Sequence, residues 1–567
     1  EAIPDDWPVD GATGYESMAR IDHALAAPDG VTTILEHERR RAGLPGAFHD
    51  LTLRTKAQAL RDLFTSERRA LRRRFLALLN ELPPPADATL RDCARALEAI
   101  TIALPRYRTY ISEGGASASD RSTLVDAIDV ARRKSPRLPA AAFAAVQRIL
   151  LLDDLPADPG ARRRHLEVIC RWQQLSGPLA AKGVEDTALY VDTSFIALNE
   201  VGAEPTQIDE DAVAALHAFF QDRAATHPRA LSALTTHDSK RSADIRARLL
   251  ALADMPDEWL QLLSEFRNAL AAINGASLDP AEESLLLQTI VGAWPLDPMS
   301  LDAFPDRVSR FMIKAAREAK RRTSWIDGNE THEAALDHAA RAVIDDIRRG
   351  ERLDSIRECI DRIAHAGALN ALSALIISAA APGAPDIYQG TERWRFMLVD
   401  PDNRGPVDFA AAAEQLRSID RELDSNPGDA IRALLDAWPD GGLKQFVTSR
   451  LLRARHDHPD LFTIGEHLPL TARGRRADHL IAFARRLNGR TAIAIAPRGA
   501  LPLTSAQQFP LGESAWDDTI IPLPADAPSR WRCALTGHSI DSRSMNGDPV
   551  IGAAEALAAL PVALLIG

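Results

Sequence analysis

Two short apolar segments, each running directly into a cluster of polar residues, most constrain how this chain can fold. Residues 231–238 (LSALTTHD) and 384–390 (APDIYQG) are strand-like, and helical patterns fill about 240–375 between them. Short buried strands that alternate with helices, each ending in a polar loop, fit a (β/α) barrel. Catalytic groups in such barrels lie on loops at the C-terminal ends of the strands. Both polar clusters are therefore candidate parts of a site.

The predicted fold class is α/β: part of a (β/α)8 TIM barrel with large α-helical insertions, followed by a C-terminal antiparallel β-sandwich domain. A doubly wound sheet is the alternative, but no Gly-rich phosphate loop supports it. From about residue 441, short segments bounded by turns indicate the antiparallel domain; they are KQFVTS, HLIAFARRL, TAIAIAPR and PVALLIG.

Residues 16 to about 170 have mainly helical patterns. The clearest apolar stripe stops at Pro83-Pro84-Pro85, and its members are Leu60, Leu63, Phe64, Leu71, Phe75, Leu78, Leu79 and Leu82. A second helix is predicted over 140–152. Residues 171–205 change character, because Gly177-Pro178 and Gly183 interrupt the pattern, and we predict a loop leaving a strand there.

Composition argues against several classes of protein. The 567 residues are 46% hydrophobic and 26% charged, as in ordinary globular proteins. The net charge of −12 predicts no general attraction to nucleic acid or to an anionic membrane. The runs Arg72–Arg74 and Arg162–Arg164 are better explained as solvated helix faces than as a phosphate-binding patch. No run of about 18 apolar residues occurs, so no membrane span is predicted.

The cysteines give no sign of a metal or disulfide framework. The four of them, Cys93, Cys170, Cys359 and Cys533, lie far apart and lack metal-ligand spacing. Few cysteines in a long chain fit a reducing compartment, and a cytoplasmic location is expected. Because no phosphate loop, dinucleotide fingerprint or metal cluster is present in the sequence, no cofactor or metal is expected.

The first candidate site is the THD motif. An aspartate at the end of an apolar strand, here Asp238, can project into a barrel mouth, and the adjacent His237 can donate a hydrogen bond to a sugar hydroxyl. The alternative is that Asp238 caps the next helix, in whose early turns Ser242 and Asp244 lie. A His-Asp pair alone does not decide between them.

Two further clusters carry candidate binding residues. DIYQGTE (386–392) is followed by DPDNRGPVD (400–408), in which Arg404 supplies a planar set of donors while Asp400 and Asp402 supply acceptors. The alternative is a surface turn network whose side chains satisfy backbone groups. The third cluster is KGVEDT (182–187), where the alternative is a salt-bridged loop.

Taken together, these segments match one family. The matching strings, in family order up to about residue 475, are WPVDGATGYE (7–16), GPLAAKGVEDTALY (177–190), LNEVGAEP (198–205), TTHDSKRSADIRARL (235–249), QTIVGAWP (288–295), KAAREAKRRTSW (314–325), GAPDIYQGTE (383–392) and LVDPDNRGPVDF (398–409). The chain resembles the maltooligosyltrehalose synthases, a group within the α-amylase superfamily. KGVEDTA together with LVDPDNR separates this family from ordinary amylases.

The resemblance implies an intramolecular transglucosylation that converts the reducing-end α-1,4 linkage of a maltooligosaccharide to an α,α-1,1 linkage, as in trehalose biosynthesis. By resemblance, Asp238 is the third carboxylate of the superfamily, which stabilises an oxocarbenium-like transition state, and His237 hydrogen-bonds the same sugar ring. Positions of substrate binding or pocket support are matched by Lys182, Glu185, Tyr190, Tyr388, Asp400, Asp402 and Arg404.

The same resemblance places the nucleophilic aspartate and the general-acid glutamate upstream of the segment that begins at Trp7, and so before residue 1. Glu1 matches a later glutamate of the family and is not assigned catalysis. We therefore expect the chain to be inactive unless an N-terminal barrel half is supplied, either as missing sequence or as a separate chain. The partners expected are a maltooligosaccharide and, in the same pathway, a maltooligosyltrehalose trehalohydrolase.

Six regions are predicted on this basis: a barrel segment after the general-acid strand (1–44), a helical insertion (45–170), barrel strands and loops with the THD motif (171–240), a second helical insertion (241–375), the last barrel strand with a substrate loop (376–420) and a C-terminal β domain (421–567). Two alternatives for the function stay open. One is another hydrolase or transglucosidase of the α-amylase superfamily, and the other is a fragment that binds α-glucan without catalysis.

Overall fold

The computed structural model describes residues 3, 7–44, 46–82, 87–153, 155–274, 278–504 and 508–567. The chain forms two compact units. Unit 1 comprises Glu1–Trp7, Gly46–Asp192 and Glu318–Lys320, and unit 2 comprises Pro8–Pro45, Thr193–Arg317 and Arg321–Gly567. Glu1 and the predicted helix stop at Pro83–Pro85 lie outside the described residues.

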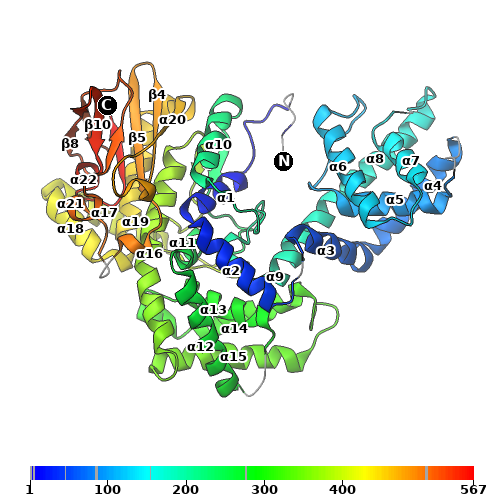
Figure 1. Ribbon diagram of the computed structural model, residues 1–567, viewed down its shortest axis with the longest axis horizontal. Helices are drawn as coiled ribbons and strands as arrows, with labels where there is room; N and C mark the ends of the chain where they lie inside the picture. The colour runs from blue at the N-terminus through cyan, green and yellow to red at the C-terminus, as the bar shows by residue number, and fades with distance from the viewer. Residues whose placement is uncertain are drawn as a thin grey trace. The chain divides into compact units, whose positions relative to one another are not determined.

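Unit 1 is built from helices that share one apolar core (Figure 1). Its helices are α3 (Phe48–Asp62), α4 (Thr65–Glu81), α5 (Leu90–Ala103), α6 (Ala118–Lys134), α7 (Ala140–Leu150), α8 (Pro159–Ala180) and α9 (Leu189–Val191). Phe75 and Trp172 are fully buried in the core. The Trp172 indole still satisfies its N–H, which donates to Thr101 Oγ1 at 2.9 Å. The helix predicted over 140–152 is confirmed as α7.

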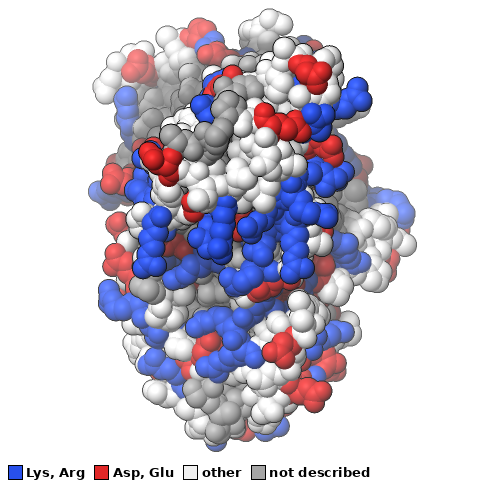
Figure 2. Space-filling view, turned by 90° about the vertical axis from the view of Figure 1, so that its right-hand side faces the viewer, with Lys and Arg blue, Asp and Glu red and all other residues white. Residues whose placement is uncertain are grey.

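The arginine runs of unit 1 lie mostly on exposed helix surface. All three residues of Arg72–Arg74 are exposed. Arg74 pairs with Glu167 at 3.2 Å, and Arg164 pairs with Glu81 at 2.8 Å. Acidic side chains stand among the basic ones on the face turned to the viewer in Figure 2. These contacts agree with solvated, ion-paired helix faces.

Two sequence predictions for unit 1 need correction. The apolar stripe is interrupted at Leu63 and Phe64, where α3 ends and α4 begins. The loop predicted from residue 171 is wrong as far as Val191, because α8 continues through Gly177-Pro178 and then passes into a π-helix (Ala181–Ala188) and α9. Gly183 is a packing residue and not a turn, since a Cβ there would lie 2.4 Å from Lys56 Cγ.

Unit 2 has a helical part and a sheet part. Its helices are α1 (Tyr15–Leu25), α2 (Pro28–Arg41), α10 (Ala212–Thr226), α11 (Ala243–Leu250), α12 (Pro256–Asn274), α13 (Pro280–Ala293), α14 (Phe304–Ala319), α15 (Glu330–Arg349), α16 (Asp354–Ala380), α17 (Phe409–Ser425), α18 (Pro427–Asp436), α19 (Gly442–Asp457), α20 (Pro459–Thr463), α21 (Gly512–Trp516) and α22 (Ala553–Ala556).

Helix α16 is the central helix of unit 2. It is long and apolar enough to cross a membrane by length and composition, but its apolar window is completely buried inside the protein, as in a core helix. Gly367 lets α11 approach it closely, because a Cβ at that position would lie 2.4 Å from Arg248 Cγ. Helix α11 begins shortly after the THD loop, so its packing against α16 also fixes the position at which that loop ends.

Three sheets complete unit 2. Strands β1 (Leu231–Ala233) and β2 (Ala384–Asp386) pair in parallel. A six-stranded antiparallel sheet has the order β3-β4-β5-β11-β7-β8, and a three-stranded one has the order β6-β10-β9. Their strands are β3 (Glu466–Leu470), β4 (Leu480–Leu487), β5 (Arg490–Pro497), β6 (Ile520–Pro522), β7 (Arg530–Cys533), β8 (Ser539–Asp541), β9 (Arg543–Met545), β10 (Asp548–Gly552) and β11 (Ala563–Ile566).

Three of the four predicted C-terminal strand segments are confirmed, as β4, β5 and β11. The fourth, KQFVTS, is wrong, because these residues lie in helix α19. Lys444 and Gln445 are both buried there. Lys444 Nζ donates to the Asp244 carboxylate at 2.8 Å, and Gln445 Nε2 donates to Ala412 O at 2.8 Å. The polar side chains of this segment are buried and find partners inside the protein. The segment therefore lacks the alternation of buried and exposed residues that is typical of a half-buried strand.

Candidate functional site

The parallel pair β1–β2 brings two of the predicted clusters to one edge. Leu231 lies opposite Ala384, and Ala233 lies opposite Asp386. Since parallel strands end at the same edge, the THD loop after β1 and the DIYQG loop after β2 leave the pair side by side. The short strands were predicted, and β1 and β2 confirm them over three residues each.

Asp238 lies in a loop whose backbone is well fixed. Its N–H donates to Thr236 Oγ1 at 3.1 Å, and Thr236 N–H donates to Ser239 Oγ at 2.9 Å. The Asp238 side chain is half-buried, and its carboxylate has no hydrogen-bond or ion-pair partner within the described part of the chain. The helix-cap alternative does not hold, because α11 begins only after Ser242 as its N-cap. The backbone of the loop is therefore fixed, and the carboxylate is left available for a ligand.

A chain of hydrogen bonds joins three loops around this position. Asn403 Nδ2 donates to the His237 carbonyl at 2.9 Å, and Tyr388 Oη donates to the Asn403 carbonyl at 3.1 Å. The His237 side chain itself is exposed, and Tyr388 is half-buried. Asn403 is not among the binding residues predicted from the sequence. In the structure, it connects DPDNR with both strand-end loops.

The other residues of DPDNR are engaged within the protein to different degrees. Asp402 accepts two hydrogen bonds from Arg307, at 2.9 and 2.8 Å, and one from Leu398 N–H at 2.8 Å. Asp400 pairs with Lys314 at 2.7 Å. The Arg404 side chain is exposed. Asp402 therefore supports the loop by bidentate pairing, whereas Arg404 extends into solvent.

A buried polar network under the THD loop was missed by the sequence analysis. The Glu200 carboxylate accepts the Lys240 N–H at 2.8 and 3.0 Å and lies 3.6 Å from Arg246. Arg246 also donates to Asp22 at 2.7 Å. All four residues are nearly inaccessible to solvent. Glu200 belongs to the LNEVGAEP string, but only its partners in space reveal its part in supporting the site.

Burial also controls ionisation in this network. It raises the pKa of the Asp22 carboxyl to about 6, although the neighbouring Arg246 favours the charged form. A carboxyl with such a pKa marks a strongly desolvated site. Among the described residues, no group of three or more His, Cys, Asp or Glu side chains is arranged to hold a metal ion.

The remaining predicted site residues, Lys182, Glu185 and Tyr190, belong to unit 1. Lys182 pairs with Asp186 at 2.6 Å one helical turn later. Glu185 and Tyr190 are buried, with 8% and 6% of their surface exposed. All three lie in or next to the π-helix, a distortion that is frequent at functional sites. The ion pair agrees with the salt-bridge alternative, but the segment is helical and not a loop.

Comparisons with known proteins extend this picture. No protein-family model matches the chain. A protein of Mycobacterium tuberculosis named as a maltooligosyl trehalose synthase is 30% identical over 578 residues, covering 100% of this chain and 64% of the relative. The solved maltooligosyltrehalose synthase of Arthrobacter ramosus is 36% identical with a TM-score of 0.79, covering 100% of this chain and 65% of that one.

This chain is similar along its whole length to known maltooligosyltrehalose synthases. The likeness extends over the whole chain, and it includes the fold of the Arthrobacter ramosus enzyme. A further solved maltooligosyl trehalose synthase, at 22% identity and a TM-score of 0.69, shares the fold. The resemblance to this family predicted from the eight sequence strings is thus confirmed. The chain spans about 64% of the length of the curated relatives it matches.

Proposed function

We propose that this chain forms part of a maltooligosyltrehalose synthase, an intramolecular transferase acting on maltooligosaccharides. The observation that carries the proposal is the Asp238 carboxylate, which lies in a hydrogen-bonded loop after the parallel strand β1 and has no protein partner in the described chain. The homology of the whole chain to such synthases supports the choice of reaction. The product is an oligosaccharide ending in an α,α-1,1 linkage.

The proposed mechanism is that of a retaining glycosidase in which the released glucose, and not water, attacks the glycosyl-enzyme. Two carboxyl groups roughly 5–5.5 Å apart act as nucleophile and acid/base in such enzymes. We assign neither of these roles to Asp238. Instead, its negative charge stabilises the positive charge that develops on the sugar ring in the oxocarbenium-like transition state. His237, next to it on the exposed side of the loop, hydrogen-bonds the same ring.

The architecture and partners of the complete enzyme belong to the same proposal. Strands β1 and β2 would be neighbouring strands of a (β/α)8 barrel. The nucleophile and the acid would come from the portion of the related synthases that this chain does not cover. A maltooligosyltrehalose trehalohydrolase would consume the product. A cytoplasmic location is supported by the four cysteines, which are all unpaired.

The test joins the unmatched part of a related synthase to the N-terminal side of these 567 residues in one polypeptide. Incubation with maltopentaose should consume the reducing end and give the anomeric NMR signals of an α,α-1,1 linkage. Asp238→Asn should lower kcat/KM by about 10²–10³-fold or more, equivalent to roughly 3–4 kcal/mol of transition-state stabilisation. The matched control is Asp345→Asn, which changes an exposed aspartate on α15.

Other outcomes select the alternatives. Free reducing sugars as the main product would indicate a hydrolase of the α-amylase superfamily. Oligosaccharide binding without turnover would indicate a non-catalytic α-glucan-binding protein. If the Asp238→Asn and Asp345→Asn enzymes were equally active, the role assigned to Asp238 would be wrong.

A further inference from the structure

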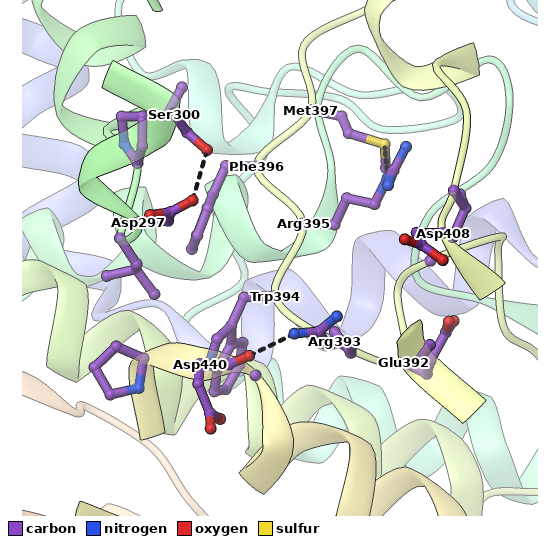
Figure 3. Close-up of a pocket in the computed structure, with 18 of the residues that line it drawn as sticks. Asp297, Ser300, Glu392, Arg393, Trp394, Arg395, Phe396, Met397, Asp408 and Asp440 are labelled. Carbon is purple, nitrogen blue, oxygen red and sulfur yellow. Dashed lines mark hydrogen bonds between the residues drawn. The ribbon is translucent and has the colours of Figure 1, made fainter. Parts of the chain in front are cut away.

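Unit 2 contains a groove beside the DPDNR loop, whose Asp402 forms part of its wall. It follows the extended segment 392–397 and has a volume of about 800 Å³, within the roughly 300–1,000 Å³ of small-molecule sites. Its other walls are the loop 295–300, the beginning of α17 and the turn 439–441 (Figure 3). Neither His237 nor Asp238 lines it. We call it the 392–397 groove.

Two aromatic side chains of the segment are held rigidly in this groove. Trp394 Nε1 donates to the Trp438 carbonyl at 2.6 Å, and Lys444 Nζ lies 5.5 Å from the Trp394 ring centroid. The Arg248 guanidinium lies 3.5 Å from the Phe396 ring centroid. Because Lys444 and Arg248 are buried, they support the rings from the protein side, and the accessible parts of both rings face the groove that they line. Fixed aromatic surfaces accept the apolar C–H faces of sugar rings.

Donors and acceptors surround these rings. Arg393 donates to the Asp440 carbonyl at 2.8 Å through one nitrogen. Among the described residues, the Glu392 carboxylate has no hydrogen-bond or ion-pair contact, although it interacts electrostatically with Arg395. Figure 3 shows Glu392 and Asp408 on one side of the groove, and Asp297 and Ser300 on the other. A ligand lying along the segment would therefore meet planar cationic donors and carboxylate acceptors alternately.

This arrangement selects the chemistry of the ligand. The groove lining carries the acidic side chains Asp297, Glu392, Asp402, Asp408 and Asp440 and the basic side chains Arg307, Arg393 and Arg395. Arg307 and Asp402 neutralise one another at 2.8 Å. The excess of carboxylates disfavours an anionic ligand, whereas hydroxyl groups can both donate to a carboxylate and accept from a guanidinium. A neutral polyhydroxylated chain meets both conditions.

We propose that the 392–397 groove binds a segment of a neutral α-1,4-linked oligosaccharide, at residues separate from Asp238. The polyhydroxylated character of the ligand follows from the groove itself, and the α-1,4 linkage rests on the proposed function. Such a site would hold a long glucan on the enzyme independently of its reducing end.

The test measures binding of maltoheptaitol to the 567-residue chain by titration calorimetry. The reducing-end ring of this compound has been opened by reduction, so the proposed reaction cannot convert it. We expect Trp394→Ala and Glu392→Ala each to weaken binding at least fivefold. Their matched controls, Trp325→Ala and Glu358→Ala, change exposed residues elsewhere in unit 2 and should bind as the unmodified chain does.

The outcomes separate this proposal from the proposed function. Loss of turnover in the joined enzyme, with groove binding intact, would count only against the reaction. The groove proposal is overturned if maltoheptaitol fails to bind at about 10 mM, a generous limit for a weak site, or if cellohexaose binds equally well. It is also overturned if Glu392→Ala, a surface change that cannot disturb the core, binds as tightly as Glu358→Ala.

Discussion

Replacing Glu200 by alanine should loosen the loop that carries Asp238. The Glu200 carboxylate is 2% exposed and accepts the N–H groups of Lys240 and Val201, the second at 2.9 Å. Its removal leaves two buried donors without acceptors, each costing about 1–3 kcal/mol. It also removes one of the two carboxylates near Arg246, so that Asp22 remains as the only acidic partner of Arg246 among the described residues. Breaking a buried charged network typically costs 3–5 kcal/mol, so we expect a loss of about 3–5 kcal/mol.

Urea unfolding gives the overall loss, while amide hydrogen exchange of Lys240 and Val201 reports on the loop directly. Glu200→Gln keeps an oxygen acceptor, so its effect should be smaller, about 1–2 kcal/mol. The control is Glu210→Ala, at an exposed position. The reasoning is refuted if Glu200→Ala costs less than about 1 kcal/mol and the Lys240 amide exchanges as slowly as in the unmodified chain.

Two further predictions concern packing and pH. Gly183→Ala places a methyl group 2.4 Å from Lys56 Cγ and 2.8 Å from Lys56 Cα, so it should destabilise unit 1 by about 1–3 kcal/mol in urea unfolding, whereas Gly114→Ala, with 3.6 Å to its nearest neighbour, should not. His217 and His467 lie 3.1 Å apart, and burial lowers their pKa values to about 4 and about 2. Below about pH 6.5, these histidines bind more protons in the unfolded chain than in the folded one. Their contribution to the free energy of unfolding is therefore complete above that pH and is lost on acidification, by about 2 kcal/mol per histidine between about pH 7 and pH 5. Burial raises the pKa values of Asp22 and Asp254 to about 6, which acts in the opposite direction. The measurement is therefore the difference between the unmodified chain and His217→Phe/His467→Phe, and an identical pH dependence of both would contradict it.

Local sequence patterns were sufficient where neighbouring residues determine the structure. An apolar run that ends in polar residues predicted β1 with Asp238 beyond it, and a similar run predicted β2. A helical pattern predicted α7, and short segments bounded by turns predicted β4 and β5. The ordered strings then indicated the family, and the comparisons agree with it.

The errors have a common physical origin. KQFVTS has a strand-like composition, but Lys444 finds the Asp244 carboxylate 200 residues earlier in the chain, and a helix places it there. Gly183 has the sequence signature of a turn, yet in the structure it allows the helix to pack closely against Lys56. In each case, a partner distant in the sequence outweighed the local preference.

The sequence by itself therefore determined the short strands, most helices and the position of a candidate carboxylate at a strand end, because these depend on the spacing of near neighbours. Only the tertiary structure decided that Asp238 is not a helix cap and that Asn403 connects three loops. It also decided that Glu200 anchors the backbone beneath the site. These contacts join residues up to 166 positions apart, and only the packed chain brings such partners within hydrogen-bonding distance.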